Sequence, residues 1–172
     1  MLSNSKGQLQ ERVQRAADFV EFYRKQTEDR LRQDIKNRTD EACAIAAGLV
    51  DRYQGEFKQD LLYRVVRDSL RNINYNDGRG YFFALNMNGV SELFADKPHL
   101  EGKDLSAIQD SNGQFVIKDM LAIARESGEG YYRYTWSKPG SDTNDHIKVA
   151  FIKYLPELDW VIGTGEYLTD VQ

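Results

Sequence analysis

The run Gly-Tyr-Phe-Phe-Ala-Leu at residues 80–85 turns at Asn88-Gly89, and its character returns in Phe-Ile-Lys-Tyr at 151–154 and Trp-Val-Ile-Gly-Thr-Gly-Glu-Tyr at 160–167. These runs alternate with period two, are rich in aromatic and β-branched residues, and are bounded by Gly, Pro and Asn, which is typical of antiparallel strands. Asn-Gly between two such runs is a strong hairpin signal. With a further strand predicted at 131–136, we expect an antiparallel sheet of about five strands.

A single long helix is predicted at the start of the chain. From Leu9 to Leu49 apolar or small side chains recur every three or four residues, and neither Pro nor Gly occurs between Gln8 and Ala47. This spacing predicts a helix of about 45 residues and roughly 65 Å, longer than a compact domain is wide. We expect its apolar second half to pack on the sheet and its charged first half to project or to pair with another chain.

Two shorter helices complete the expected fold. Gln54-Gly55 ends the long helix, and further helices are predicted at 56–72 and 115–126. The chain is therefore expected to be of the α+β class, with a long N-terminal helix in residues 1–55 and a sheet domain in residues 56–172.

Composition excludes several classes of protein. The chain has 172 residues with 23 Lys and Arg against 27 Asp and Glu, and no basic stripe, which argues against nucleic-acid binding. Its one cysteine, Cys43, cannot form an intrachain disulfide and lies in an apolar run, where we expect it to be buried. No run of about 18 apolar residues is present, so a soluble chain is expected, and a domain lying between two membrane spans has the same composition.

Enzyme chemistry finds little support in the sequence. The two histidines, His99 and His146, lie in polar segments without a second His or a Cys at metal-ligand spacing. Gly163-Thr164-Gly165 lacks the third glycine and the following helix of a phosphate-binding loop, so we interpret these glycines as making room for close packing or for a ligand. We expect no catalytic residue, no metal and no cofactor.

Aromatic side chains gather on the predicted strands. Alternation puts Tyr132, Tyr134 and Trp136 on one face of their strand, and Tyr81 and Phe83 on one face of the first strand. Such stripes line either a core or a pocket.

Lys153 stands out because its strand is mostly apolar on both faces. Val149, Phe151 and Lys153 share one face, and Ala150 and Ile152 share the other. A buried ammonium needs a partner, which is either an acidic side chain or an external anion; the alternative is that the lysine reaches solvent at the sheet edge. Tyrosine hydroxyls and an indole N–H would add neutral donors for a small carboxylate, whereas an aromatic cage for a cation is the competing chemistry.

The candidate ligand-binding residues are Lys153, Phe151, Trp136, Tyr134, Phe83, Tyr81 and Phe94.

Several motifs recur in the order of a known family. They are GYFFALNMNG at 80–89, Lys97-Pro98 followed by LEGKDL at 100–105, WSKPG at 136–140, FIKY at 151–154 and WVIGTG at 160–165. Together they resemble the single Cache domain, the extracytoplasmic sensor of bacterial chemoreceptors and histidine kinases. The resemblance covers about residues 56–170, and the whole chain with the long helix.

The resemblance implies a PAS-like antiparallel sheet on a long N-terminal helix, in the periplasmic part of an inner-membrane protein anchored by flanking membrane helices. It also implies a pocket for a small organic acid such as acetate, propionate, pyruvate or lactate. The family's aromatic-x-Lys motif falls on Phe151 and Lys153. Its other aromatic positions fall on Tyr134, Trp136, Tyr81 and Phe83. Phe94-Ala95 stands where many relatives have His-Pro, and Phe151 stands where Tyr is frequent, which makes this pocket less polar.

The expected function is therefore that of a chemoreceptor sensor domain, in which closure of the loop from Lys97 to Leu105 shifts the last strand, at Tyr167, relative to the long helix. Open alternatives are a histidine kinase sensor with the same ligand class, a PAS-like domain holding flavin or haem, and a ligand-free dimerisation module. A homodimer through the N-terminal helix is expected, and a solvated helix face is the alternative. The seam of that dimer would be Leu9, Val13, Ala16, Val20 and Tyr23.

Overall fold

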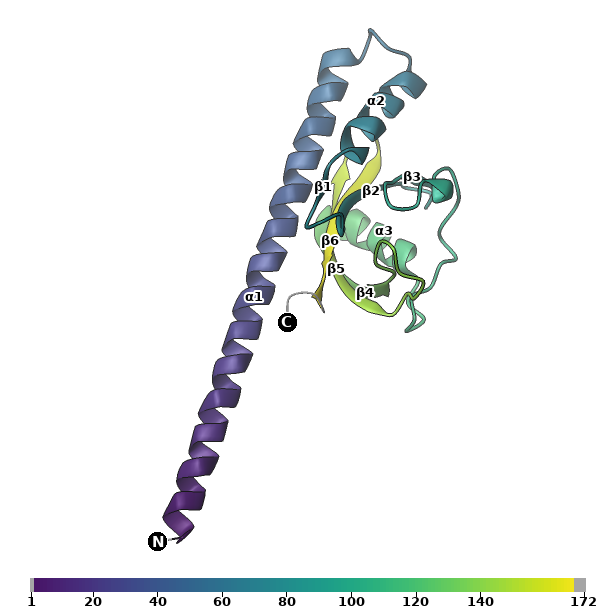
Figure 1. The fold of residues 1–172 in the computed structure, drawn as a ribbon. Helices are drawn as coiled ribbons and strands as arrows, with labels where there is room; N and C mark the ends of the chain where they lie inside the picture. The colour runs from purple at the N-terminus through teal and green to yellow at the C-terminus, as the bar shows by residue number, and fades with distance from the viewer. Residues whose placement is uncertain (1, 169–172) are drawn as a thin grey trace.

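The chain is built around one long helix, α1, which spans Leu2–Tyr53 in a computed structural model that describes residues 2–168. Residue 1 and residues 169–172, the outer ends of the two predicted parts, lie outside the described residues. At 1.5 Å per residue the 52 residues of α1 extend for about 78 Å. Figure 1 shows its N-terminal half projecting away from the rest of the molecule and its second half lying along the sheet.

Burial along α1 confirms the expected division of the helix. The side chains of Leu31, Ile35, Ala42 and Ala46 are buried, and the residues between Gln8 and Tyr23 are exposed. Cys43 is buried on the same face, and burial raises the pKa of its thiol to about 12. Among the described helices, none combines the length and the apolar character that crossing a bilayer requires.

The sheet has six strands in the described part of the chain, with the order β1-β2-β6-β5-β4 and with β3 paired to β2. All pairs are antiparallel, as the sequence predicts. The strands are β1 Asn74–Tyr75, β2 Gly80–Asn86, β3 Ser91–Phe94, β4 Glu129–Trp136, β5 His146–Leu155 and β6 Trp160–Tyr167.

The strand that the sequence does not predict is β1, which lies in a turn-rich stretch before the first predicted strand. Its two residues pair with β2 across a turn in which Asn76, Asp77 and Gly78 all have positive φ. A two-residue strand is too short to show a period of two, so its sequence reads as a turn.

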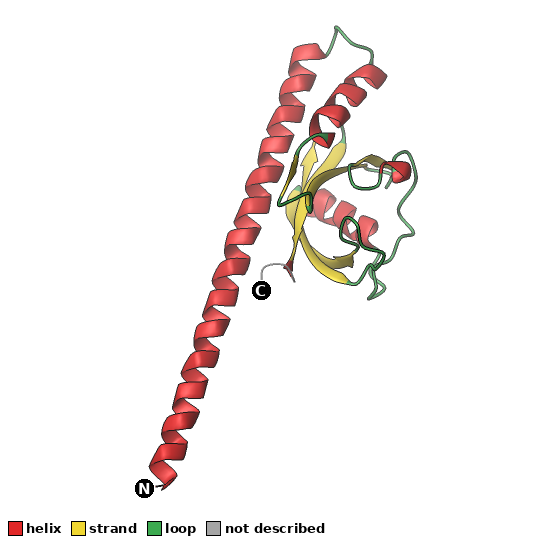
Figure 2. Cartoon of the chain, in the orientation of Figure 1, coloured by secondary structure: helices red, strands yellow, loops and turns green. Residues whose placement is uncertain are grey.

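Helices cover both faces of the sheet (Figure 2). On one face, Phe82, Ile162 and Trp160 pack against α1 and against α2, which spans Gln59–Arg71. On the other face, the sheet packs against α3, which spans Val116–Ser127 and ends at Gly128 in the left-handed conformation. The segment between β3 and α3, which includes the short 3-10 helix η1 at Pro98–Leu100, borders this second face.

Candidate ligand-binding site

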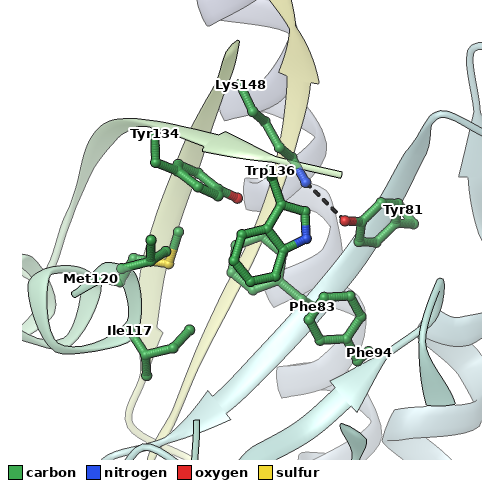
Figure 3. Close-up of a pocket in the computed structure, with 9 residues that line it drawn as sticks. Tyr81, Phe83, Phe94, Ile117, Met120, Tyr134, Trp136 and Lys148 are labelled. Carbon is green, nitrogen blue, oxygen red and sulfur yellow. Dashed lines mark hydrogen bonds between the residues drawn. The ribbon is translucent and has the colours of Figure 1, made fainter. Parts of the chain in front are cut away.

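A small cavity lies between the sheet and α3. Its volume is about 20 Å³, room for about one water molecule. Figure 3 shows aromatic side chains from β2, β3 and β4 converging on it, with one lysine from β5 at its edge. The lining residues are Tyr81, Phe83, Phe94, Val116, Ile117, Met120, Tyr134, Trp136 and Lys148.

Strand alternation and register explain why these side chains meet. Tyr81 and Phe83 lie two apart on β2, and Tyr134 and Trp136 lie two apart on β4, so each pair points to one face. Lys148 of β5 is the direct cross-strand partner of Tyr134. The cavity is thus assembled from one face of the sheet, to which β2, β3, β4 and β5 contribute side chains, and from α3.

Two glycines of β6 give the lining side chains room to cross that strand. A Cβ atom on Gly165 would lie 2.7 Å from Lys148 Cε, and one on Gly163 would lie 2.6 Å from Phe83 Cζ. Side chains at these positions would displace the lysine and the phenylalanine. The Gly-Thr-Gly run therefore makes room for close packing around the cavity.

Lys148 is a buried amine surrounded by aromatic rings. Its side chain is 1% exposed, and its Nζ atom donates a hydrogen bond of 3.1 Å to the hydroxyl of Tyr81. Nζ lies 4.3 Å from the ring centroid of Tyr81, 5.3 Å from that of Tyr167 and 5.8 Å from that of Phe83. Within residues 2–168 this nitrogen makes no ion pair with a carboxylate.

Burial controls the charge of Lys148. Desolvation lowers the pKa of its amine to about 7, against the smaller opposing influence of the carboxylates of Asp96 and Glu166. The nearby ammonium of Lys97 lowers it further. An anion placed beside Nζ would reverse this shift, because an opposite charge favours the charged form of an amine.

Tyr134 supplies an unused donor beside this lysine. Its side chain is buried, its hydroxyl points toward the space between Lys148 and Trp136 (Figure 3), and it has no hydrogen-bond partner among the described residues. Burial raises the pKa of this hydroxyl well above its ordinary value, so it remains a neutral phenol. Tyr134 lines the cavity, so a ligand bound there can accept a hydrogen bond from this hydroxyl.

The aromatic edge of the cavity is tied to the loop after β3. Phe94 stacks on Tyr81 at 5.9 Å and on Trp136 at 6.1 Å between ring centroids. Lys97 donates to Ser137 Oγ over 2.6 Å, and Tyr167 donates to the backbone carbonyl of Ser137 over 2.6 Å. The loop after β3, the end of β4 and the end of β6 therefore meet at Ser137.

Five of the seven residues expected from the sequence line this cavity, namely Tyr81, Phe83, Phe94, Tyr134 and Trp136.

The other two, Phe151 and Lys153, lie on the opposite face of β5, against α1. Lys153 Nζ pairs with the carboxylate of Asp40 at 3.0 Å and is about one-third exposed. Phe151 packs with Leu31 and Ile35 of α1. The structure thus corrects their expected placement: β5 turns Val149, Phe151 and Lys153 to the helix and not to the cavity.

The cationic residue of the cavity, Lys148, was not singled out in the sequence analysis. Lys148 shares a strand face with Ala150 and Ile152, opposite to the face of Lys153. A lysine on this apolar face is the feature of the sequence that could have pointed to it as a ligand-binding residue. The cavity residues of α3, among them Ile117 and Met120, gave no such signal, because a helix sequence does not tell which strand its apolar side meets.

Comparison with known proteins identifies the family. A family model described as Cache domain matches residues 1–172. The chain belongs to the Cache domain family. The expected PAS-like α+β fold is confirmed by solved Cache domains that share it.

Two curated relatives of this Cache domain are signalling proteins. The methyl-accepting chemotaxis protein McpP of Pseudomonas putida is 31% identical over 147 residues, which are 83% of this chain and 27% of that protein. The sensor histidine kinase MctS of Rhizobium johnstonii is 34% identical over 92 residues, 54% of this chain and 20% of that protein. The chain spans about a quarter of the length of these relatives or less.

Three solved structures show the same architecture over most of the chain. A methyl-accepting chemotaxis protein from Vibrio parahaemolyticus has a TM-score of 0.76 at 28% identity, covering 87% of this chain and 96% of that one. A structure described as showing carboxylic acid recognition by a Cache chemosensory domain has a TM-score of 0.70 at 26% identity, covering 81% and 97%. A periplasmic sensor domain of a chemotaxis protein has a TM-score of 0.65 at 29% identity, covering 77% and 96%. These neighbours confirm the extracytoplasmic location expected from the sequence.

Proposed function

We propose that this Cache domain binds a small organic monocarboxylate in the cavity beside Lys148. The observation that carries the proposal is a buried amine with no acidic partner among residues 2–168, at the edge of a cavity. Burying an ammonium without a counter-ion is costly, and a ligand carboxylate would supply the missing negative charge. Lys148 thereby takes the role that the sequence analysis expected of Lys153.

The neutral donors of the cavity fit the same ligand. The hydroxyl of Tyr134 and the indole N–H of Trp136 are both presented by β4 on the cavity face. Either group donates to a carboxylate oxygen, so one oxygen meets the amine of Lys148 and the other meets β4. The short tail of the acid then contacts Phe83 and Met120.

Size and charge limit the choice of acid. A cavity of about 20 Å³ admits a ligand of a few heavy atoms only with a small outward movement of its aromatic walls. Its lining includes no carboxylate for the α-ammonium of an amino acid. Acids of two to four carbons without an ammonium group, such as acetate, propionate, pyruvate or lactate, meet the charge limit and need the smallest movement of the walls. The solved neighbour described as recognising a carboxylic acid supports this ligand class.

The wider protein is proposed to be a chemotaxis receptor, without catalytic activity, anchored by membrane helices that flank this domain. Residues 56–172 form the sensor and residues 1–55 the connecting helix. The chemotaxis relative supports this output, and the sensor histidine kinase relative supports a kinase as the alternative with the same ligand class.

Ligand binding in the cavity would be transmitted to α1 by movements of β5 and β6. β5 presents Lys148 to the cavity and, on its other face, Phe151 and Lys153 to α1. Ser137 links the loop residue Lys97 to Tyr167 at the end of β6. A ligand that draws Lys148 and Trp136 together therefore shifts both strands relative to α1, provided that it binds the two arrangements with different affinity.

The projecting half of α1 favours a second property, pairing with another copy of the chain. Leu9 and Val13 are each 62% exposed, and Val20 and Tyr23 are 56% and 53% exposed. Apolar side chains at this spacing on a projecting helix are typical of a coiled-coil seam. Sedimentation at several concentrations tests it: a dimer is expected for the chain and a monomer for Val13→Glu.

A thermal-shift panel tests the ligand class. Two- to four-carbon monocarboxylates are compared with amino acids and quaternary amines on the wild type, on Lys148→Met and on Lys153→Met. Ligand at about 100 times its Kd stabilises the fold by roughly 2.7 kcal/mol, a shift of several degrees. We expect monocarboxylates alone to stabilise the wild type and Lys153→Met. A shift with amines only, or an undiminished shift in Lys148→Met, would contradict the proposal.

A further inference from the structure

The surroundings of Lys148 contain few charges. From β2 and β4, the groups that face it are the phenols of Tyr81 and Tyr134, whose pKa values burial raises well above the ordinary range. β6 contributes the phenol of Tyr167. The preceding residue of β6, Glu166, points to the other face of the sheet, where the side chain of Asn76 and the backbone N–H of Tyr167 donate hydrogen bonds to its carboxylate.

The remaining groups are farther from the amine. The loop after β3 carries Asp96 and Lys97, which influence Lys148 only through space. His146 of β5 lies edge-on to the Tyr167 ring at 6.4 Å, and Lys138 lies 5.8 Å from the same ring. From α3 the cavity receives apolar side chains such as Ile117 and Met120. The amine is thus the basic group that the cavity itself presents, and no acidic group shares a hydrogen bond with it in the described chain.

We propose that Lys148, where its amine is neutral in the empty cavity, takes up a proton from solvent when the cavity binds a carboxylate, so that the sensor responds to the acid and to the proton together. This inference rests on the proposed function. In the empty cavity a neutral amine avoids an uncompensated buried charge; in the complex the carboxylate makes the ammonium the favoured form.

The balance of the step is simple. A carboxylate anion, a solvent proton and the neutral amine give an ammonium–carboxylate pair, with no covalent bond made or broken. The net species bound is the undissociated acid. Above neutral pH the same total concentration of acid therefore gives a weaker response, because fewer protons are available to bind with it.

The size of the effect follows from the charge of the empty site. Since burial places the pKa of Lys148 at about 7, its charged fraction falls about tenfold per pH unit above that value. The apparent Kd is expected to rise about 50-fold between pH 7 and pH 9 and to change less than about twofold between pH 6 and pH 7.

Titration calorimetry measures the proton directly. Acetate, propionate, pyruvate and lactate are each titrated at pH 8 in phosphate and in Tris, and at pH 6 in phosphate and in bis-Tris. The two buffers of each pair differ in ionisation enthalpy, so the difference in heat gives the protons taken up. We expect about 0.9 proton per acid at pH 8 and about 0.1 at pH 6. The variant His146→Gln is the control for the histidine two residues before Lys148 on β5, and it is expected to keep the full uptake.

The outcomes separate the inference from the function on which it rests. An acid that binds equally well at pH 7 and pH 9 without proton uptake overturns the inference and leaves the ligand class standing. Loss of the uptake in His146→Gln also overturns it, because the proton would then belong to the histidine. If none of the four acids binds at pH 6, the proposed ligand class fails and the inference fails with it.

Discussion

Replacing Lys148 with methionine is expected to stabilise the empty domain at low pH. Methionine fills a similar volume without a charge to desolvate. Burial lowers the pKa of the lysine from 10.5 to about 7, so the folded state binds fewer protons than the unfolded state between these values. The wild type therefore carries the full penalty below pH 7 and loses it progressively as the pH rises toward 10.5.

The shift in the pKa of Lys148 sets how much the stability of the wild type changes with pH. Between pH 6 and pH 9 this linkage stabilises the wild type by about 3 kcal/mol relative to Lys148→Met. At pH 6 the variant is expected to be the more stable of the two, because the hydrogen bond to Tyr81 that it loses is worth only about 1 kcal/mol. Urea unfolding at the two pH values, followed by tryptophan fluorescence, measures both differences.

Lys153→Met is the matched control on the same strand. Its lysine pairs with Asp40, and that hydrogen bond raises its pKa above 10.5, so its contribution to stability is constant between pH 6 and pH 9. The pair is partly exposed, and its loss is expected to cost under about 1 kcal/mol. If Lys148→Met and the wild type differ in stability by the same amount at pH 6 and pH 9, the burial argument for Lys148 is refuted.

Two further substitutions, and acid binding by Lys153→Met, test the geometry of the cavity. Tyr134→Phe removes a hydroxyl that has no partner in the described chain, so it should leave stability nearly unchanged and weaken acid binding about tenfold, as calorimetry would show. Gly165→Ala places a Cβ atom 2.7 Å from Lys148 Cε and should both destabilise the fold by about 1–3 kcal/mol and weaken binding, whereas unchanged binding would contradict the role given to this glycine. Lys153→Met should bind the acid as tightly as the wild type, and a large loss of affinity would return that residue to the site.

Much of the fold follows from local patterns in the sequence. The apolar spacing of α1, the Asn88-Gly89 hairpin and the alternation of the later strands each specify an element without reference to the rest of the chain. β1 is not predicted from the sequence because it is only two residues long and because its neighbours have turn conformations. The expected helix also begins later than the observed one, since its polar first residues carry no apolar period.

The site was harder to predict than the fold, and β5 shows why. Alternation correctly separated Lys153 from its neighbour Ile152, but it does not say which face meets α1 and which meets α3. That choice depends on tertiary packing: Lys153 finds Asp40 on the helix, whereas Lys148 is enclosed by tyrosines. A lysine with an acidic partner in the chain is fixed by that partner, and a lysine without one is the better candidate for a ligand.

The most direct test of the central claim is the crystal structure of the domain with the acid that gives the largest thermal shift. The account predicts one carboxylate oxygen within about 3 Å of Lys148 Nζ and the other within hydrogen-bond distance of Tyr134 or Trp136. An acid bound outside this cavity, or in it with its carboxylate turned away from Lys148, would contradict the account.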